Sequence, residues 1–400
     1  MTERTTLYPF QAQGVKMIHE FDGRVLLADD VGLGKTVQSL VYTWRYASDD
    51  PGPVVIVVPA HLRLNWRDEA MKHLGLKVEV LYGQRVPDGY APSVDSDQVF
   101  VIGANTLAPP HWKARTVPPA DSWVRWLADQ KPRMLIGDEG HIFKEPTSAR
   151  TRAFRRLARA TTRTMILTGT PMVNTPKDLW SLLNILLPAR YPSQFDFCAE
   201  YTNAQKKWYG WDFKGARNLD KLHAELTDTC MIRRLKQDVL TDLPVVQHSV
   251  VPLEVPLREY RKAENDFLAW LDREAPEMAK SAAKIKGLAR VTNLRRLAGR
   301  IKIPAVLDWI KGFRDDTGHK LLVGLAHYAV SDALVAGFPA RSCTLVDGRV
   351  TGDEKHIRFA RFNTDPDCAL CFANIEAAGT GWSCTATSDA ALAELPWRPG

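Results

Sequence analysis

The stretch RVLLADDVGLGKT at residues 24–36 decides the fold that we predict for this chain. Its apolar first part favours a short buried strand, and its last residues favour the start of a helix. Gly32 and Gly34 lie in the turn between them, where glycine lets backbone N–H groups approach phosphate oxygens. The order of strand, glycine-containing turn and helix is that of a phosphate-binding P-loop.

Lys35 and Thr36 follow this turn directly, at the N-terminus of the predicted helix. In a P-loop the lysine reaches the terminal phosphates of a nucleotide, and the hydroxyl holds Mg²⁺. The positive end of the helix dipole favours the same anion. The strict pattern has glycine where this chain has Asp29, so a chance glycine-containing turn stays open as the alternative.

An acidic pair follows a second apolar run, MLIGDEGH at residues 134–141. Open α/β sheets bind ligands at the carboxyl ends of their strands, so we expect Asp138 and Glu139 at the edge that holds the P-loop. Asp138 is the expected partner of Mg²⁺, and Glu139 is expected to orient or deprotonate an attacking water. A solvated turn could carry the same two residues, but the P-loop pattern upstream favours a site.

Short apolar runs alternate with helical patterns over residues 1–190, which predicts an α/β fold with a parallel sheet covered on both faces. The predicted strands are residues 24–28, 53–58, 77–81, 98–103, 134–138 and 164–167. Residues 257–273 and 279–300 favour long helices, and the alternation returns at residues 320–326, 342–347 and 368–374. We therefore predict two α/β domains, residues 1–190 and 316–400, separated by a mainly helical insert at residues 191–315.

The composition excludes several classes of protein. Of the 400 residues, 45% are hydrophobic and 25% charged, which is typical of globular domains, and six cysteines are too few for a disulfide framework. Neither a membrane-spanning run nor a signal-peptide pattern occurs, so we expect no membrane partner and a cytoplasmic protein, or a nuclear one in a eukaryote. The net charge of +7 arises from an excess of basic side chains within residues 101–300. That excess favours a nucleic acid as partner, although a solvated basic surface would look the same.

Residues 146–177 contain no acidic side chain, and five arginines there have helical spacing. They are Arg152, Arg155, Arg156, Arg159 and Arg163. On one helix these side chains would share a face, because residues three or four apart lie one above the other. Like charges on that face repel one another, so binding to a phosphate backbone would stabilise the stripe. The alternative interpretation is a helix face that is simply exposed to solvent.

Together these motifs resemble those of the Swi/Snf-type ATPases of helicase superfamily two, which are DNA translocases that include annealing helicases. The segment ADDVGLGKT is similar to the family's A-D-E-x-G-L-G-K-T, and DEGH at residues 138–141 is similar to its D-E-x-H box. LTGTPMVNTPKDLWSLL at residues 167–183 and MIRRLKQDVLTDLP at residues 231–244 resemble two further family segments. LYPFQ at residues 7–11 resembles its entry motif, and AAGTGWSCTAT at residues 377–387 resembles its second-lobe glycine motif.

The resemblance implies two RecA-like parallel-sheet lobes of the P-loop NTPase fold, with ATP and Mg²⁺ as ligands. It assigns catalysis to Lys35, Asp138 and Glu139, and the Mg²⁺ ion to Thr36 and Asp138. It places the nucleotide against Gln11, which would read the adenine, and against Gly32, Gly34, Lys35, Thr36, Gly379 and Gly381. Candidates for coupling ATP to DNA are His141, Thr168, Thr170 and Thr380, and candidates for touching DNA are Arg152, Arg156, Arg159, Arg233 and Arg234.

We therefore expect an ATP-dependent motor that translocates on double-stranded DNA, because this family generally moves on duplexes without separating the strands. A strand-separating DNA or RNA helicase is one alternative, and a DNA-binding subunit with little turnover is another. In the family, a motif with arginines that complete the ATP site follows a P-W-x-P-G segment, and this sequence ends with PWRPG at Gly400. We expect a fragment, a second polypeptide that supplies the motif, or weak ATPase activity.

Overall fold

The computed structural model describes residues 5–48, 50–75, 77–92, 98–108, 112, 118–172, 174–208, 210–240, 246–265, 286–378 (the backbone alone for 286–290), 382 and 384–395. Contacts divide the chain into two compact units, Met1–Pro244 and Val245–Gly400. The sequence predicts two domain boundaries, at residues 190 and 315, whereas the contacts define one. The three-part division therefore stays a prediction. Among the described residues, no helix combines the length and the apolar character needed to cross a membrane.

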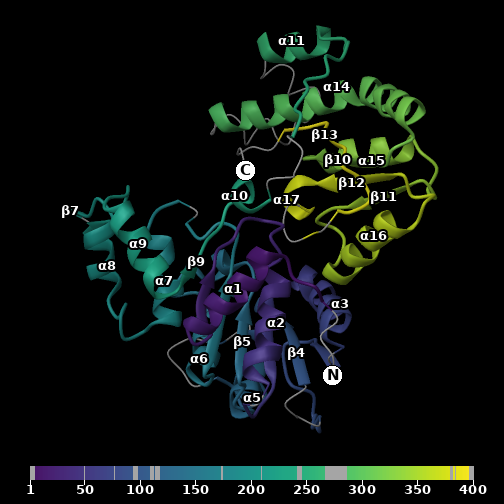
Figure 1. Cartoon of the computed structure of the whole chain (residues 1–400). Helices are drawn as coiled ribbons and strands as arrows, with labels where there is room; N and C mark the ends of the chain where they lie inside the picture. The colour runs from purple at the N-terminus through teal and green to yellow at the C-terminus, as the bar shows by residue number, and fades with distance from the viewer. Residues whose placement is uncertain are drawn as a thin grey trace. The chain divides into compact units, whose positions relative to one another are not determined.

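The first unit is built on a seven-stranded parallel sheet in the order β3-β4-β2-β5-β6-β1-β9 (Figure 1). The strands are β1 (Arg24–Leu27), β2 (Val54–Val58), β3 (Lys77–Leu81), β4 (Gln98–Gly103), β5 (Met134–Gly137), β6 (Arg163–Leu167) and β9 (Met231–Ile232). The first six confirm the predicted α/β fold, and each of their ends lies within one residue of the prediction.

Helices cover both faces of this sheet. The helices of the first unit are α1 (Pro9–Glu20), α2 (Lys35–Ala47), α3 (Arg63–Leu74), α4 (Ala104–Leu107), α5 (Trp123–Asp129), α6 (Ala149–Arg159), α7 (Lys177–Leu186), α8 (Gln194–Tyr201), α9 (Leu219–Thr229) and α10 (Lys236–Val239), with 3-10 turns η1 (Ala60–Leu62) and η2 (Gly140–Phe143). Successive strand residues belong to opposite cores: Leu26 lies in the core that contains Phe154 of α6, and Leu27 in the core that contains Val41 of α2. Burial on both faces explains why the strands read as continuous apolar runs.

Strand β9 is an element that the sequence analysis misses. Its two residues are buried and pair with β1, Leu26 with Met231 and Leu27 with Ile232. Two residues are too few to show an alternation of apolar and polar positions, so only the pairing defines this strand. The pairing joins a segment from the predicted helical insert to the first sheet.

A two-stranded antiparallel ribbon, β7 (Gln205–Lys207) and β8 (Gly210–Asp212), also belongs to the first unit. It lies between α8 and α9 in the sequence and pairs with neither sheet. We call residues 203–217, which contain these two strands, the aromatic ribbon.

The second unit has a four-stranded parallel sheet in the order β11-β12-β10-β13. Its elements are α11 (Arg258–Asn265), α14 (Lys286–Thr317), β10 (Leu321–Leu325), α15 (Tyr328–Ala336), β11 (Cys343–Val346), α16 (Gly352–Thr364), β12 (Leu370–Asn374), α17 (Ile375–Ala378) and β13 (Ala390–Leu392). The three predicted strands of this part are confirmed, and β13 is a fourth that the sequence analysis misses. The predicted helix at 279–300 is seen from Lys286 and runs on to Thr317, because Val306 and Ile310 pack into the core of this sheet.

Candidate active site

Four motif-bearing strands are consecutive in the first sheet: β5, β6, β1 and β9. Because all four are parallel, their carboxyl ends meet at one edge of the sheet. The acidic pair follows β5, the LTGTP segment follows β6, the P-loop follows β1, and Arg233 and Arg234 follow β9. The sheet order thus brings together four motifs that are spread over more than half of the sequence.

The P-loop turn has the backbone that its glycines predict. Gly32 and Gly34 have φ angles of +87° and +73°, in the left-handed region that favours glycine. Gly34 immediately precedes α2, and a Cβ atom there would lie 2.4 Å from Nε2 of Gln11. Glycine is therefore required at position 34 both for conformation and for the approach of Gln11.

Lys35 lies inside the loop. Its Nζ donates to the carbonyl oxygens of Asp29 at 2.9 Å and Asp30 at 3.1 Å. Burial lowers the pKa of the Lys35 ammonium, while nearby carboxylates, led by that of Asp138, act in the opposite direction. The lysine therefore lies within the field of the acidic pair, and Thr36 follows it in the first turn of α2.

Gln11 of α1 is held against the same loop. Its side chain is 8% exposed, its Nε2 donates to the carbonyl oxygen of Leu33 at 3.3 Å, and its Oε1 accepts from the backbone N–H of Tyr8 at 3.1 Å. The geometry places Gln11 beside the P-loop, as a nucleotide-contacting residue requires. Its reading of adenine remains a prediction.

Asp29 stands where the strict P-loop pattern has glycine, and the structure gives a reason. Its buried carboxylate accepts from Nη2 of Arg234 at 2.5 Å and from Nε of Arg234 at 3.0 Å. Nε2 of Gln38, from α2, donates to the same carboxylate at 3.1 Å. Arg233 donates from Nη1 to the carbonyl oxygen of Ala28 at 2.9 Å. Both arginines are thus bonded to the end of β1, and their roles on DNA remain predictions.

Asp138 and Glu139 directly follow β5, and both carboxylate oxygens of Asp138 accept hydrogen bonds. Oδ2 of Asp138 accepts from Nε1 of Trp66 at 2.8 Å, and Oδ1 accepts from the backbone N–H of Glu139, also at 2.8 Å. Burial raises the pKa of the Asp138 carboxyl to about 6, against these two hydrogen bonds and the charge of Lys35. Glu139 has a φ angle of +52°, which is uncommon for a residue with a side chain.

Trp66 is a site residue that the sequence analysis misses. Its ring is fully buried in α3. The tryptophan side chain has one polar atom, and a buried Nε1–H needs an acceptor, which here is Asp138. The spacing in the sequence cannot show which carboxylate accepts it.

The predicted coupling residues of the first unit lie next to the acidic pair. Nδ1 of His141 is 3.2 Å from Oε2 of Glu139, within ion-pair range but without hydrogen-bond geometry. Oγ1 of buried Thr168 accepts from the backbone N–H of Thr170 at 3.1 Å. A Cβ atom on Gly169 would lie 2.8 Å from Val31 of the P-loop, so the LTGTP segment packs directly on that loop. The structure therefore joins these residues to the site, and their coupling role remains a prediction.

The arginine stripe is shorter than predicted. Helix α6 ends at Arg159, and Arg163 begins β6 and forms an ion pair with Asp50. The prediction that Arg163 shares the helical face is wrong, because the sheet needs this segment as the neighbour of β1 and β5. Arg156 and Arg159 are exposed, while Nη2 of Arg152 donates to the carbonyl oxygen of Thr147.

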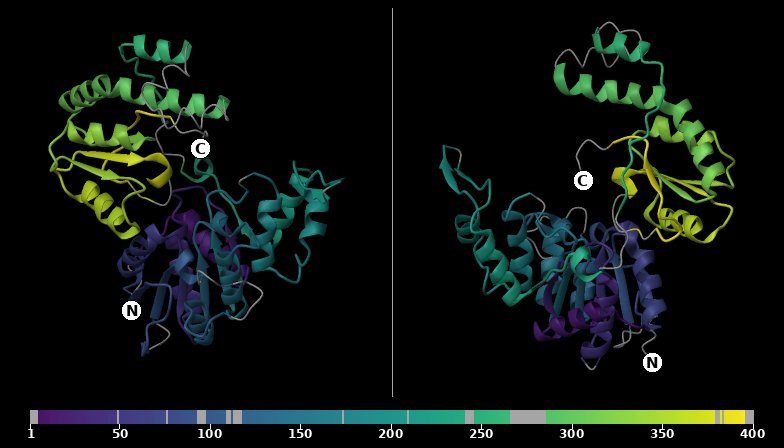
Figure 2. Two further views of the ribbon diagram at one scale, coloured as in Figure 1. Left: turned by 180° about the vertical axis from the view of Figure 1, so that it is seen from behind. Right: turned by 45° about the horizontal axis from the view of Figure 1, so that its top comes forward.

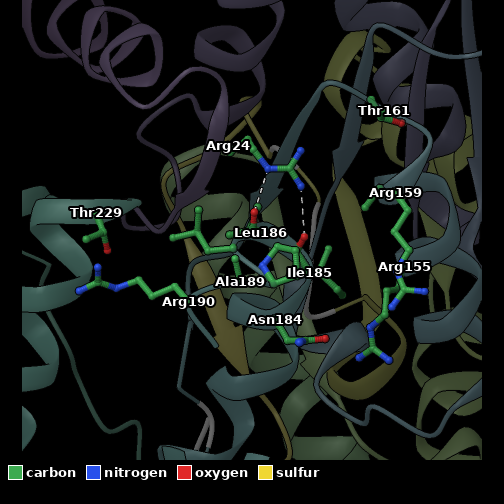
Figure 3. A pocket seen from close by; sticks show the side chains of 13 residues that line it. Arg24, Arg155, Arg159, Thr161, Asn184, Ile185, Leu186, Ala189, Arg190 and Thr229 are labelled. Atoms are coloured by element: carbon green, nitrogen blue, oxygen red, sulfur yellow. Dashed lines mark hydrogen bonds between the residues drawn. The ribbon is translucent and has the colours of Figure 1, made fainter. Parts of the chain in front are cut away.

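Arg155 and Arg159 extend into a cavity of about 690 Å³ at the other edge of the sheet (Figure 3). Arg24, the first residue of β1, also lines it and donates to the carbonyl oxygen of Leu186 at 2.8 Å. Since the P-loop follows the carboxyl end of β1, this cavity lies away from the candidate active site. The stripe therefore does not form one continuous face that leads to the P-loop.

The second-unit candidates Gly379, Thr380 and Gly381 lie outside the described residues. Among the residues that are described, no group of three His, Cys, Asp or Glu side chains could hold a metal ion. Thr36 and Asp138 remain the candidates for Mg²⁺. Two protein ligands fit Mg²⁺, because this ion usually keeps several waters and shares the phosphates of its substrate.

A parallel sheet whose carboxyl edge carries a P-loop beside an acidic pair defines the class of P-loop NTPases. A family model described as the SNF2-related domain matches residues 10–297. The chain therefore belongs to the SNF2-related family, whose members are ATPases.

Several relatives are similar over almost the whole chain. The "DNA annealing helicase and endonuclease ZRANB3" of Mus musculus is 31% identical over 406 residues, which cover 99% of this chain and 36% of that protein. The "SWI/SNF-related matrix-associated actin-dependent regulator of chromatin subfamily A-like protein 1" of Xenopus tropicalis is 28% identical over 99% of this chain and 40% of that protein. The chain thus spans well under half the length of these curated relatives. Among solved structures, the "Sulfolobus solfataricus SWI2/SNF2 ATPase core in complex with dsDNA" is similar over 98% of this chain and 82% of that chain, with a TM-score of 0.49 and 18% identity.

Proposed function

We propose that this chain is an ATP-dependent motor that couples ATP hydrolysis to movement along double-stranded DNA. The observation that carries the proposal is the convergence of the P-loop, the acidic pair, the LTGTP segment and Arg233-Arg234 at one edge of a parallel sheet. The family membership supports ATP as the substrate.

In this proposal each residue of the site has a separate task. Lys35 exchanges its loop carbonyl partners for the terminal phosphates, to which its ammonium offers a compact positive charge. Thr36 and Asp138 would hold Mg²⁺, which would neutralise charge on the phosphates. Glu139 orients the attacking water, because its carboxylate follows the metal ligand directly. Gly379 and Gly381 lie outside the described residues, and their contact with the nucleotide remains a prediction from the family resemblance.

Two observations support double-stranded DNA as the track. The excess of basic side chains lies in residues 101–300, and Arg156 is exposed on α6. Relatives that match almost the whole chain are named DNA annealing helicases, and annealing acts opposite to strand separation. Translocation on duplexes, with a role in replication or repair, is therefore preferred over unwinding.

The test is the ATPase rate of the purified chain with and without duplex DNA at low salt. We expect stimulation by duplex, and a loss of about 10²–10³-fold in kcat for Lys35→Ala, because a preorganised cation on the phosphates is removed. Lys16→Ala, on the exposed face of α1, is the matched control and should leave the rate unchanged. Activity retained in Lys35→Ala would overturn the site assignment.

Two further results would contradict the proposed motor. Tight duplex binding without stimulated hydrolysis would favour a DNA-binding subunit with little turnover. Displacement of a third strand from a triplex, without unwinding of a plain duplex, is the result expected of a translocase. The opposite result would favour a strand-separating helicase.

A further inference from the structure

The aromatic ribbon, residues 203–217, projects from the first unit beyond α8 and α9 (Figures 1 and 2). Its strands pair Gln205 with Asp212, Lys206 with Trp211 and Lys207 with Gly210. Within these strands every described side chain is exposed except that of Asp212, which is half-buried. A two-stranded ribbon with both faces in water gains little stability from its own pairing.

The base of the ribbon is nevertheless firmly attached. The backbone N–H of Asn203 donates to the carbonyl oxygen of Lys214 at 3.0 Å, and that of Arg217 donates to Tyr201 at 3.1 Å. The ring of Trp211 lies edge-on to Phe195 of α8, with centroids 5.0 Å apart. The ribbon is therefore held in a defined direction on a helical base.

Aromatic side chains of the ribbon and of its base are exposed to water rather than packed in a core. Trp208 at the tip is 96% exposed, and Trp211 and Phe195 are 47% and 43% exposed. Other tryptophans of this unit, such as Trp66 and Trp123, are buried. Large apolar groups gathered on an exposed projection mark an interaction site rather than a packing site.

The charge of the ribbon indicates which partner it fits. Residues 203–217 contain four basic side chains, Lys206, Lys207, Lys214 and Arg217, against one acidic side chain, Asp212. Asp212 forms an ion pair with Lys207 at 3.2 Å, so it neutralises one of these cations. The remaining excess is positive, and Lys206 and Lys207 directly precede Trp208 in the sequence. Basic side chains next to exposed aromatic ones are the pattern of a site for single-stranded nucleic acid.

We propose that the aromatic ribbon binds unpaired nucleotides, with Trp208 stacked on a base and Lys206 on an adjoining phosphate. A base within a duplex has both faces covered by its neighbours, so only an unpaired or terminal base offers a free face to Trp208. This inference rests on the proposed function. The motor would move along duplex DNA, and the ribbon would bind the unpaired bases next to that duplex.

The test measures the affinity of the whole chain for a fluorescently labelled oligo(dT) strand by anisotropy. Base–aromatic stacking is worth about 1–3 kcal/mol, so Trp208→Ala should weaken binding roughly 5- to 150-fold. Trp208→Phe should restore most of the affinity, since phenylalanine keeps an aromatic face. Tyr46→Ala, which removes a partly exposed aromatic ring from α2, is the matched control and should change affinity less than about twofold.

A salt titration tests the role of the lysines independently of stacking. Lys206→Ala should reduce the slope of log affinity against log salt by about 0.7, the value for one phosphate contact to a single strand. Trp208→Ala should leave that slope unchanged. Because Trp208 is so exposed, neither variant should change the midpoint of urea unfolding.

Unchanged oligo(dT) affinity in Trp208→Ala would overturn the proposal and leave a protein partner as the occupant of the ribbon. The duplex-stimulated ATPase rate separates this result from the proposed function. If Trp208→Ala loses oligo(dT) binding while the rate stays at the wild-type level, both proposals are supported. If the wild type binds oligo(dT) through Trp208 but hydrolyses no ATP, only the motor is overturned.

Discussion

Asp29 and Arg234 are separated by 205 residues, yet they form a buried ion pair with Nη2 and Oδ2 2.5 Å apart. Asp29 follows β1 and Arg234 follows β9, so this pair joins the ends of two neighbouring strands at the P-loop. Oε1 of Gln38 accepts from Nη2 of the same guanidinium at 2.7 Å. The pair explains why an acidic residue can stand at the first position of the loop.

Arg234→Ala should lower the free energy of unfolding by about 3–5 kcal/mol, because it leaves the buried carboxylate of Asp29 without its cation. Urea denaturation measures this loss. Arg85→Ala is the control, since its ion pair with Asp121 is exposed and should contribute less than about 1 kcal/mol. Equal losses in the two variants would contradict the structural role of the buried pair.

Trp66→Phe should lower the ATPase rate, because it removes the N–H that orients Asp138 while keeping an aromatic ring in the core. The lost hydrogen bond to a charged group corresponds to about 1.5–3 kcal/mol, or roughly a 10- to 150-fold effect on metal-dependent turnover. The matched variant is Trp123→Phe, whose buried Nε1 donates to the carbonyl oxygen of Gly83 at 3.2 Å, away from the site. It should lose stability but keep its kcat, and a similar fall in kcat would argue against a specific role for Trp66.

The stability of the metal-free protein should depend on pH through Asp138. Burial raises the pKa of this carboxyl from 3.8 to about 6, so between these values the folded chain binds a proton that the unfolded chain has released. The stability that this carboxyl contributes is complete below about pH 4 and is lost as the pH rises through 6. Urea midpoints of wild type and Asp138→Asn in EDTA should therefore diverge over this window, with the wild type losing stability relative to the variant. Parallel curves would show that Asp138 titrates normally.

The cavity arginines should differ in their effects on stability. Nε and Nη2 of Arg155 are buried without a hydrogen-bond partner among the described residues, so Arg155→Met should leave the unfolding free energy unchanged or raise it. Arg24 donates to the carbonyl oxygens of Leu186 and Thr162 at 2.8 and 2.9 Å, and Arg24→Met should cost about 3 kcal/mol. Thermal or urea unfolding of both variants checks the contrast. A large loss in Arg155→Met would mean that its guanidinium has a stabilising partner.

Much of the fold could be predicted because the sheet strands are buried on both faces. Runs such as residues 54–58 and 98–103 are apolar throughout, so they stand out from the amphipathic helices between them. The P-loop and the acidic pair were equally visible, because phosphate and metal chemistry restrict the residue types at fixed spacings. Strand β9 could not be predicted from the sequence, because two residues show no periodicity and form a strand only by pairing with β1.

The sequence by itself determined the class of the protein and the motifs that meet at the candidate site, since those depend on short patterns read locally. The tertiary structure alone decided which distant side chains complete the site. Trp66 reaches Asp138 and Arg234 reaches Asp29 because the sheet order places α3, β5, β1 and β9 near one edge. The tertiary structure also places Arg163 in β6, where it pairs with Met134 of β5, and therefore outside the arginine stripe. Sheet order is a property of long-range packing, which no local spacing of residues encodes.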